Sequence, residues 1–273
     1  MSVLVQKNLG ITSAAVVGKE TLHISALSDA IANICGPDVD PWVFAIEASK
    51  AGQYQGDATK FWDGANDVAI ANAGTGDITL GSVNGNVTVY SIDGNADNFT
   101  GHVALPGTEW SMLFIGSPEA DNSTPLGIVS YSSAAAPGVG SGDRGIRIGF
   151  SYNLARAFVA FQGSDASSPT DFPANMDLQY VHNFTGEDVV MLVTYSTAEG
   201  LKMFIGDAVT PAAVNADATD YDTGLAIGEW RCGYYYRGHM AFTGFLNKDL
   251  SKSKWDGDRA AMMEACAAWY AGS

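Results

Sequence analysis

The stretch at residues 187–207, EDVVMLVTYSTAEGLKMFIGD, constrains the fold more than any other part of this chain. Two apolar runs, Val189–Tyr195 and Leu201–Ile205, flank a short polar turn that ends at Gly200. Val, Thr, Tyr and Phe favour strands, and Gly200 supplies the positive φ angle that a tight reversal needs. The pattern predicts a β-hairpin, and a hairpin needs further strands to bury its apolar side chains.

Strand-like segments recur from residue 41 onward, with turn residues between them. Trp42–Ala48 alternates in the manner of a half-buried strand, whereas Trp110–Ile115 (WSMLFI) is a nearly continuous apolar run, as expected of a strand covered on both faces. Glu229–Tyr236 and His239–Phe245 are interpreted as a closing pair of strands. Roughly ten to fourteen such segments predict an all-β fold, a two-sheet antiparallel jelly-roll sandwich.

The N-terminal segment, residues 1–40, differs from this pattern. It is rich in Ala and Ile, carries apolar runs such as Val3–Val5, and ends near the chain-breaking pair Gly36-Pro37. Two interpretations stay open: an arm that docks on a neighbouring subunit, or a first strand and helix that complete the domain's own core. The predicted organisation is therefore an N-terminal docking segment at 1–40 and a sandwich domain at 41–273.

The segment at residues 251–272 is the one convincing helix. Asp256 or Asp258 lies near its start, where the helix dipole favours negative charge. The stripe predicted to face the core consists of Ala260, Met263, Ala267 and Tyr270.

Composition limits the function classes. The 273 residues include 14 Lys and Arg against 30 Asp and Glu, a formal net charge of −16, which disfavours binding to phosphate backbones and so to nucleic acids. No apolar run approaches the ~18 residues of a membrane span, and the N-terminus lacks the features of a secretory signal. The three scattered cysteines, Cys35, Cys232 and Cys266, are interpreted as buried thiols rather than as a disulfide framework.

Two motifs resemble the concanavalin A-like, laminin-G-like family. In that family a strand ending in Thr-Tyr precedes a Gly-Leu-x-x-Phe strand, as Val193-Thr194-Tyr195 and Gly200–Asp207 do here. Tyr236–Ser251 is similar to the family's closing strand and Asn-x-x-Leu-Ser connector. Weaker similarities lie at Phe61-Trp62-Asp63, Asp93-Gly94 and Trp110–Phe114.

The resemblance implies a jelly roll over residues 41–272 with a C-terminal helix, as in the laminin-G-like modules of phage structural proteins. It implies a non-enzymatic structural protein on a bacteriophage virion surface, either a capsid decoration or a tail appendage. It also implies phage capsid or tail proteins as partners. The apolar runs of residues 1–40 predict a homo-oligomer, and the missing secretory signal predicts synthesis in the bacterial cytoplasm. The alternative is a lectin-like carbohydrate-binding module that recognises a cell-surface glycan, and the third hypothesis is a glycoside hydrolase of the jelly-roll class.

The sequence does not contain the carboxylate motif that a jelly-roll glycoside hydrolase requires. Jelly-roll glucanases carry two or three carboxylates at alternate positions of one strand, so that they share a face. No Glu-x-Asp-x-Glu string occurs in this sequence, so no catalytic residues are predicted. The four histidines are widely separated, without the spacing of a zinc site, and are interpreted as hydrogen-bonding residues at strand edges.

Calcium is the one metal that the sequence suggests. Asp93, Asn95 and Asp97 place oxygen side chains at alternate positions, and a second acidic cluster consists of Asp217, Asp220 and Asp222. Asp and Asn also form turns in β proteins, and that interpretation is favoured. No other cofactor is predicted.

Overall fold

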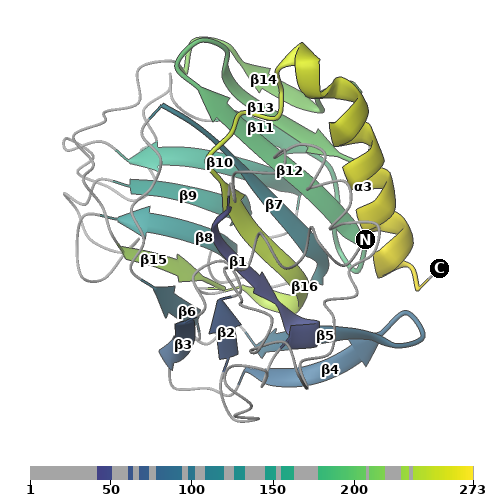
Figure 1. Ribbon diagram of the computed structural model, residues 1–273. Coiled ribbons are helices and arrows are strands. Elements are labelled where there is room, and N and C mark those ends of the chain that lie inside the picture. The colour runs from purple at the N-terminus through teal and green to yellow at the C-terminus, as the bar shows by residue number, and fades with distance from the viewer. Residues whose placement is uncertain are drawn as a thin grey trace, which may run out of the picture.

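The computed structural model describes most of the sandwich in segments. The described residues are 42–50, 61–63, 68–73, 78–93, 98–101, 108–119, 126–132, 145–151, 155–162, 178–206, 209–218, 229–233 and 236–272. The predicted arm at residues 1–40 lies outside them. The described part is an antiparallel β fold with a helix near its C-terminal end, which confirms the predicted fold class (Figure 1).

Sheet A carries the predicted hairpin. Its strands run in the order β4-β5-β16-β7-β12-β13-β14, and β1 lies beside the second half of β16, on the side where β5 pairs with its first half. The bounds are β1 Trp42–Glu47, β4 Thr79–Val83, β5 Val87–Asp93, β7 Glu109–Pro118, β12 Val189–Ser196, β13 Gly200–Ile205, β14 Ala213–Asn215 and β16 Arg237–Leu246.

Sheet B forms the opposite layer, in the order β11-β10-β9-β8-β15-β6-β3. Its strands are β3 Val68–Ala73, β6 Asn98–Gly101, β8 Leu126–Ser132, β9 Gly145–Phe150, β10 Arg156–Gln162, β11 Leu178–Val181 and β15 Glu229–Cys232. The two sheets are continuous, because β2 (Phe61–Asp63) pairs with both β1 and β3. At the other end, β11 approaches β13 and β14, which brings the two outer edges together.

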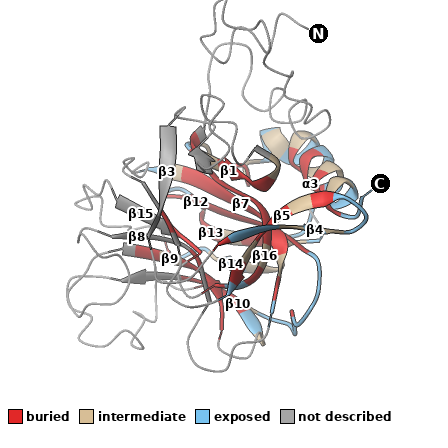
Figure 2. Cartoon of the chain, turned by 90° about the horizontal axis from the view of Figure 1, so that it is seen from below, coloured by how far each residue is buried: buried red, intermediate tan, exposed pale blue. Residues whose placement is uncertain are grey.

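The hairpin forms in the predicted register. Leu192 lies opposite Phe204, and Ser196 lies opposite Gly200, whose φ angle is 73°. Every residue of β12 is buried because β7 and β13 flank it and both of its faces are covered. The prediction of a strand covered on both faces also holds for β7 (Figure 2).

The predicted closing pair of strands is wrong. β15 pairs with β6 and β8 in sheet B, whereas β16 pairs with β1, β5 and β7 in sheet A. The chain crosses between the layers at Gly233–Tyr236, where the Tyr236 amide donates to the Gly233 carbonyl over 2.8 Å. Apolar strands adjacent in sequence suggested a hairpin, but here each completes a different sheet.

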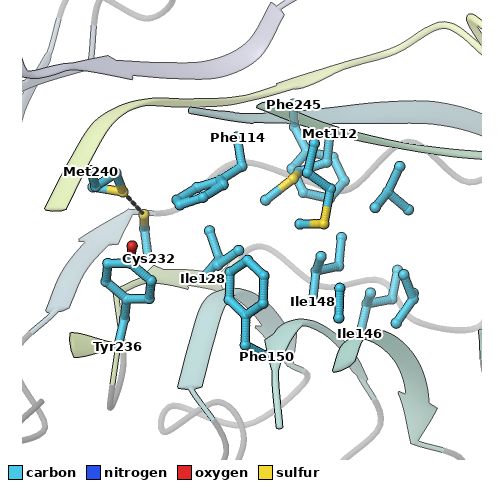
Figure 3. Packing of buried hydrophobic residues seen from close by; sticks show 14 of the residues in the cluster. Met112, Phe114, Ile128, Ile146, Ile148, Phe150, Cys232, Tyr236, Met240 and Phe245 are labelled. Atoms are coloured by element: carbon cyan, nitrogen blue, oxygen red, sulfur yellow. Dashed lines mark hydrogen bonds between the residues drawn. The ribbon is translucent and has the colours of Figure 1, made fainter. Parts of the chain in front are cut away.

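The main core fills the space between the sheets. The inward side chains of β7 and β12, such as Phe114 and Met191, face side chains of sheet B such as Ile148 and Phe150. Figure 3 shows this packing, with the thiol of Cys232 directed at the sulfur of Met240, 3.6 Å away. Cys232 and Cys266 are both buried free thiols, as predicted for these two.

A second core lies on the outer face of sheet A, beneath helix α3 (Asp256–Tyr270) (Figure 1). The outward residues of β7 and β12, including Leu113 and Leu192, pack against the helix. The predicted stripe is partly wrong, because Ala267 is exposed. The buried helix residues are Arg259, Met262, Met263, Cys266 and Tyr270.

The link between β16 and α3 is fixed by β7. The Ser111 hydroxyl donates to the Lys248 carbonyl over 2.6 Å and accepts from the Leu250 amide over 3.0 Å. A short 3-10 helix, η3 (Ser253–Trp255), then leads into α3. Both predicted acidic residues, Asp256 and Asp258, lie in the first turn of the helix. Within the described residues, no helix is long and apolar enough to cross a membrane.

Candidate functional site

A polar rim gathers where β7 ends, at Pro118. We call it the histidine rim, and it consists of Ser91, Glu119, His182, Glu187, Arg237 and His239. Two histidine–glutamate pairs flank Pro118, one on each side. The rim residues come from β5, β16, the end of β7 and the turn before β12.

The first pair is built by register. His239 of β16 lies opposite Ser91 of β5 on one side and opposite Ser117 of β7 on the other. Directly opposed residues point to the same face, so the three polar side chains form a row across the outer face of sheet A. The Ser91 hydroxyl lies 3.1 Å from His239 Nδ1.

Glu119 joins this row at the end of β7. One of its carboxylate oxygens is 3.8 Å from His239 Nε2, and the other is 3.7 Å from Arg237 Nε. The side chains of Glu119 and Arg237 are about half exposed, so this is a screened surface contact that holds the groups near one another. The groups remain open to a ligand.

Gly238 allows the two strands to approach. Its φ angle is 134°, and a Cβ at this position would lie 2.3 Å from the Ser117 carbonyl oxygen. The Tyr236 hydroxyl donates to the His239 carbonyl over 2.9 Å and fixes the start of β16 from the core side. Burial raises the pKa of Tyr236 well above its usual value, so the phenol keeps this proton.

The second pair lies in the turn between β11 and β12. His182 Nε2 is 2.8 Å from a carboxylate oxygen of Glu187, and both side chains are about half exposed. The His182 ring stacks on Tyr180, with centroids 6.0 Å apart, and meets buried Phe184 edge-on at 4.8 Å. The Gly186 amide donates to the Pro118 carbonyl over 3.2 Å, which places this turn beside the first pair.

The side chains of Ser91, His239 and Glu119 are arranged in space like a hydrolytic triad. A nucleophilic serine needs backbone amides directed at the developing oxyanion. Ser91 lies inside β5 with ladder partners on both sides, so the adjacent amides belong to the sheet. The arrangement is suited to hydrogen bonding and ion pairing with a bound molecule.

Of the two predicted calcium clusters, only one acidic member each is described, Asp93 of the first and Asp217 of the second. Asp93 is exposed at the end of β5, and Asp217 is exposed after β14; four strands of sheet A separate β5 from β14. The Asp217 amide donates to the Asn215 side chain over 3.2 Å, an Asx turn of the kind that sequence reasoning favoured. Asn95, Asp97, Asp220 and Asp222 lie outside the described residues, and among those described no cluster of three metal-binding side chains occurs. Calcium binding stays a prediction.

Sequence reasoning missed the histidine rim. It did predict hydrogen-bonding roles for the histidines, and His182 and His239 have them, although His239 lies within the sheet rather than at its edge. His23 and His102 lie outside the described residues. Only the short spacing between His182 and Glu187 was available as a signal, because Glu119 and His239 are 120 positions apart and meet through strand register.

Comparison with known proteins identifies the fold. No family model and no curated protein matches this chain. Among solved structures, the botulinum neurotoxin serotype D binding domain matches with a TM-score of 0.57 at 10% identity, over 86% of this chain and 52% of that chain. The serotype D ligand-binding domain in complex with N-acetylneuraminic acid matches with a TM-score of 0.53 at 11% identity, over 88% and 52%.

A third match is a structure of botulinum neurotoxin type C, described as entering cells through interaction with two ganglioside molecules. Its TM-score is 0.56 at 11% identity, over 86% of this chain and 53% of that chain. The present chain therefore spans about half the length of these proteins. It shares the β-sandwich fold found in receptor-binding domains of toxins, and at this identity the likeness concerns the fold alone.

Proposed function

We propose that this protein is a non-enzymatic module on the surface of a bacteriophage virion, as a capsid decoration or tail appendage, made in the bacterial cytoplasm. The observation that carries the proposal is the C-terminal part of the fold, which consists of Tyr236–Ser251 and helix α3. The segment that resembles phage laminin-G-like modules forms the centre of sheet A, and α3 packs back over that sheet. The net charge of −16 suits a solvent-facing particle surface.

Particle attachment can be measured directly. Purified protein is mixed with virions that lack it, the particles are sedimented, and the bound fraction is quantified. Saturable co-sedimentation at a fixed copy number per particle supports the proposal. Protein that stays in the supernatant with every virion preparation, and that mass spectrometry does not find in mature particles, contradicts it.

The second candidate function is glycan recognition, and the histidine rim favours it. Carboxylate, imidazole and guanidinium groups hydrogen-bond sugar hydroxyls, and the rim groups them with partly exposed side chains. Glu119 and Glu187 outnumber Arg237, so the rim favours neutral or amino sugars over acidic ones. Toxin domains that share this fold over about half of their length are described with ganglioside and N-acetylneuraminic acid ligands, which supports glycans as the ligand class.

A glycan array followed by calorimetry tests this candidate. We expect binding to neutral or amino sugars, and at least a tenfold weakening, about 1.4 kcal/mol, in Glu119→Gln and His182→Ala. Asp217→Asn is the matched control, because it neutralises an exposed carboxylate at the opposite edge of sheet A. If the native protein and all three variants bind the glycan with equal affinity, the histidine rim is not the glycan-binding site.

The non-enzymatic character is also testable. We expect no reducing-end release from β-glucans, agarose or bacterial capsule polysaccharide during prolonged incubation. Release that vanishes on neutralising one carboxylate, such as Glu119, would establish a hydrolase instead.

A further inference from the structure

Strand β4 is an unprotected edge of sheet A. Among the described strands it pairs with β5 alone. Its sequence, TLGSV, contains no charged residue and no proline, and Leu80 is 52% exposed. Natural proteins usually blunt such an edge with lysine, proline, a bulge or a covering segment, because an open strand recruits another strand.

The other two outer edges of the sandwich are protected. β14 has three residues, follows Pro211 closely, and ends in the Asx turn at Asn215. β11 approaches β13 and β14, so these edges shield each other. β4 has no such cover within the part of the chain that the structure describes, and Figure 1 shows it as the outermost strand of the β4–β5 hairpin.

The edge is held rigidly in place. The hairpin turns at Asn84 and Gly85, with φ angles of 47° and 88°. The Asn84 side-chain amide donates to an Asp188 carboxylate oxygen and to the Tyr270 carbonyl, both over 2.8 Å. The hairpin is thereby fixed to β12 and to the end of α3, so pairing with another strand costs little ordering entropy.

We propose that β4 pairs with β4 of a second copy of this chain, antiparallel around a twofold axis at Gly81, to form one continuous sheet. In this register Leu80 lies opposite the partner subunit's Ser82, and the two Leu80 side chains become diagonal neighbours on one face. Thr79 lies opposite the partner subunit's Val83. The pairing is isologous, so the assembly closes as a dimer.

The sequence of β4 is compatible with a copy of itself, because the proposed register places uncharged side chains opposite uncharged side chains and opposes no like charges. Two molecules that each carry −16 repel one another over most of their surfaces. β4 is a strip without charged side chains, so it lets two copies approach at contact distance. Because only the repulsion is screened by salt, the dimer should become tighter as the ionic strength rises.

The experiment is sedimentation velocity of the full chain over a hundredfold concentration range at low and high salt. The test variant is Leu80→Lys, and Val214→Lys is its matched control: Val214 is 51% exposed and lies on β14, the opposite edge of the same sheet. We expect the native chain and the control to dimerise, more tightly in high salt. The test variant should be at least tenfold weaker, with unchanged thermal unfolding.

Three outcomes would overturn the proposal: a native chain that stays monomeric, a Leu80→Lys protein that dimerises like the native chain, or a control that loses the dimer equally. If Leu80→Lys does not fold, Thr79→Lys carries the test, since Thr79 is exposed on the same strand with its side chain on the opposite face. A dimer lost only on deletion of residues 2–36 would assign the interface to the N-terminal segment and also contradict the proposal.

Discussion

At the scale of single residues, buried polar groups hold the two cores in register. Ser111 is fully buried and serves as both donor and acceptor for the link between β16 and α3. A hydroxyl in such a position has no solvent to replace its partners. Removing the Ser111 hydroxyl would leave its two backbone partners without hydrogen bonds, and that loss sets its contribution to the free energy of unfolding.

Ser111→Ala should lower the free energy of unfolding by about 1–3 kcal/mol, because it orphans the Leu250 amide and the Lys248 carbonyl. Urea denaturation followed by tryptophan fluorescence measures the change. Ser253→Ala, on an exposed residue outside the proposed dimer interface, is the control and should change stability by less than about 0.5 kcal/mol. If both variants change the free energy of unfolding equally, the Ser111 hydrogen bonds do not stabilise the link between β16 and α3.

Cys266 predicts a pH dependence. Burial raises the pKa of its thiol to about 12 from a usual value of 9.0. The folded state therefore keeps the proton while the unfolded chain releases it, so stability is fully present below pH 9 and falls as the pH rises towards 12. One such group costs up to about 1.4 kcal/mol per pH unit in that window.

Urea titrations of the native chain and of Cys266→Ala at pH 8, 9 and 10 test this. Cys266→Ala should be less stable at pH 8, because it leaves a cavity, but should lose less stability between pH 9 and 10. Cys232 and three buried tyrosines also have raised pKa values and will leave a residual slope. Parallel pH profiles for the two proteins would contradict the assignment to Cys266.

At the scale of elements, helix α3 seals the outer face of sheet A. Arg259 is buried beneath it, with its guanidinium 4.5 Å from the centre of the Phe204 ring, and it donates to the Leu250 carbonyl over 2.7 Å. Leu192 is fully buried on the same face. The helix and the predicted hairpin therefore share a core.

Leu192→Asp should unfold the protein or cost more than about 4 kcal/mol, since it buries an unpaired charge between β12 and α3. Val181→Asp is the control, because Val181 is 78% exposed and the side-chain change is similar. Circular dichroism during thermal unfolding measures both. A cooperatively folded Leu192→Asp protein with native stability would contradict the burial described here.

Sequence patterns predicted the long strands well but missed several of the short ones. β7 and β12 carry long, nearly continuous apolar runs, and their burial follows from composition alone. The short strands β6, β11 and β14 were missed, because NFTG, LQYV and AVN owe their conformation to neighbours that are distant in sequence. The histidine rim was missed for the same reason, since register across β5, β16 and β7 brings its residues together.

At the scale of the whole molecule, the two sheets close on one side through β2 and β3 and nearly meet on the other at β11 and β14. The described sandwich thus contains two cores that do not depend on a partner chain. Residues 1–40, predicted from sequence as a docking arm or as part of the core, are the segment whose role a deletion can decide.

Deletion of residues 2–36 should leave a folded protein that no longer binds virions, because the apolar runs of this segment suit strand or helix addition on a neighbour. Circular dichroism checks the fold and co-sedimentation checks attachment. A deletion variant that aggregates or melts at a much lower temperature would show instead that the segment belongs to the domain's own core.

The place of β16 in the chain has a consequence for how the protein is made. This strand pairs with β1, β5 and β7 at the centre of sheet A, yet it follows every other strand that the structure describes. A ribosome therefore delivers all the other described strands before the one that joins β5 to β7. Until then the partly made sheet exposes unpaired strands and apolar surface, so folding should be slow and should depend on chaperones during synthesis.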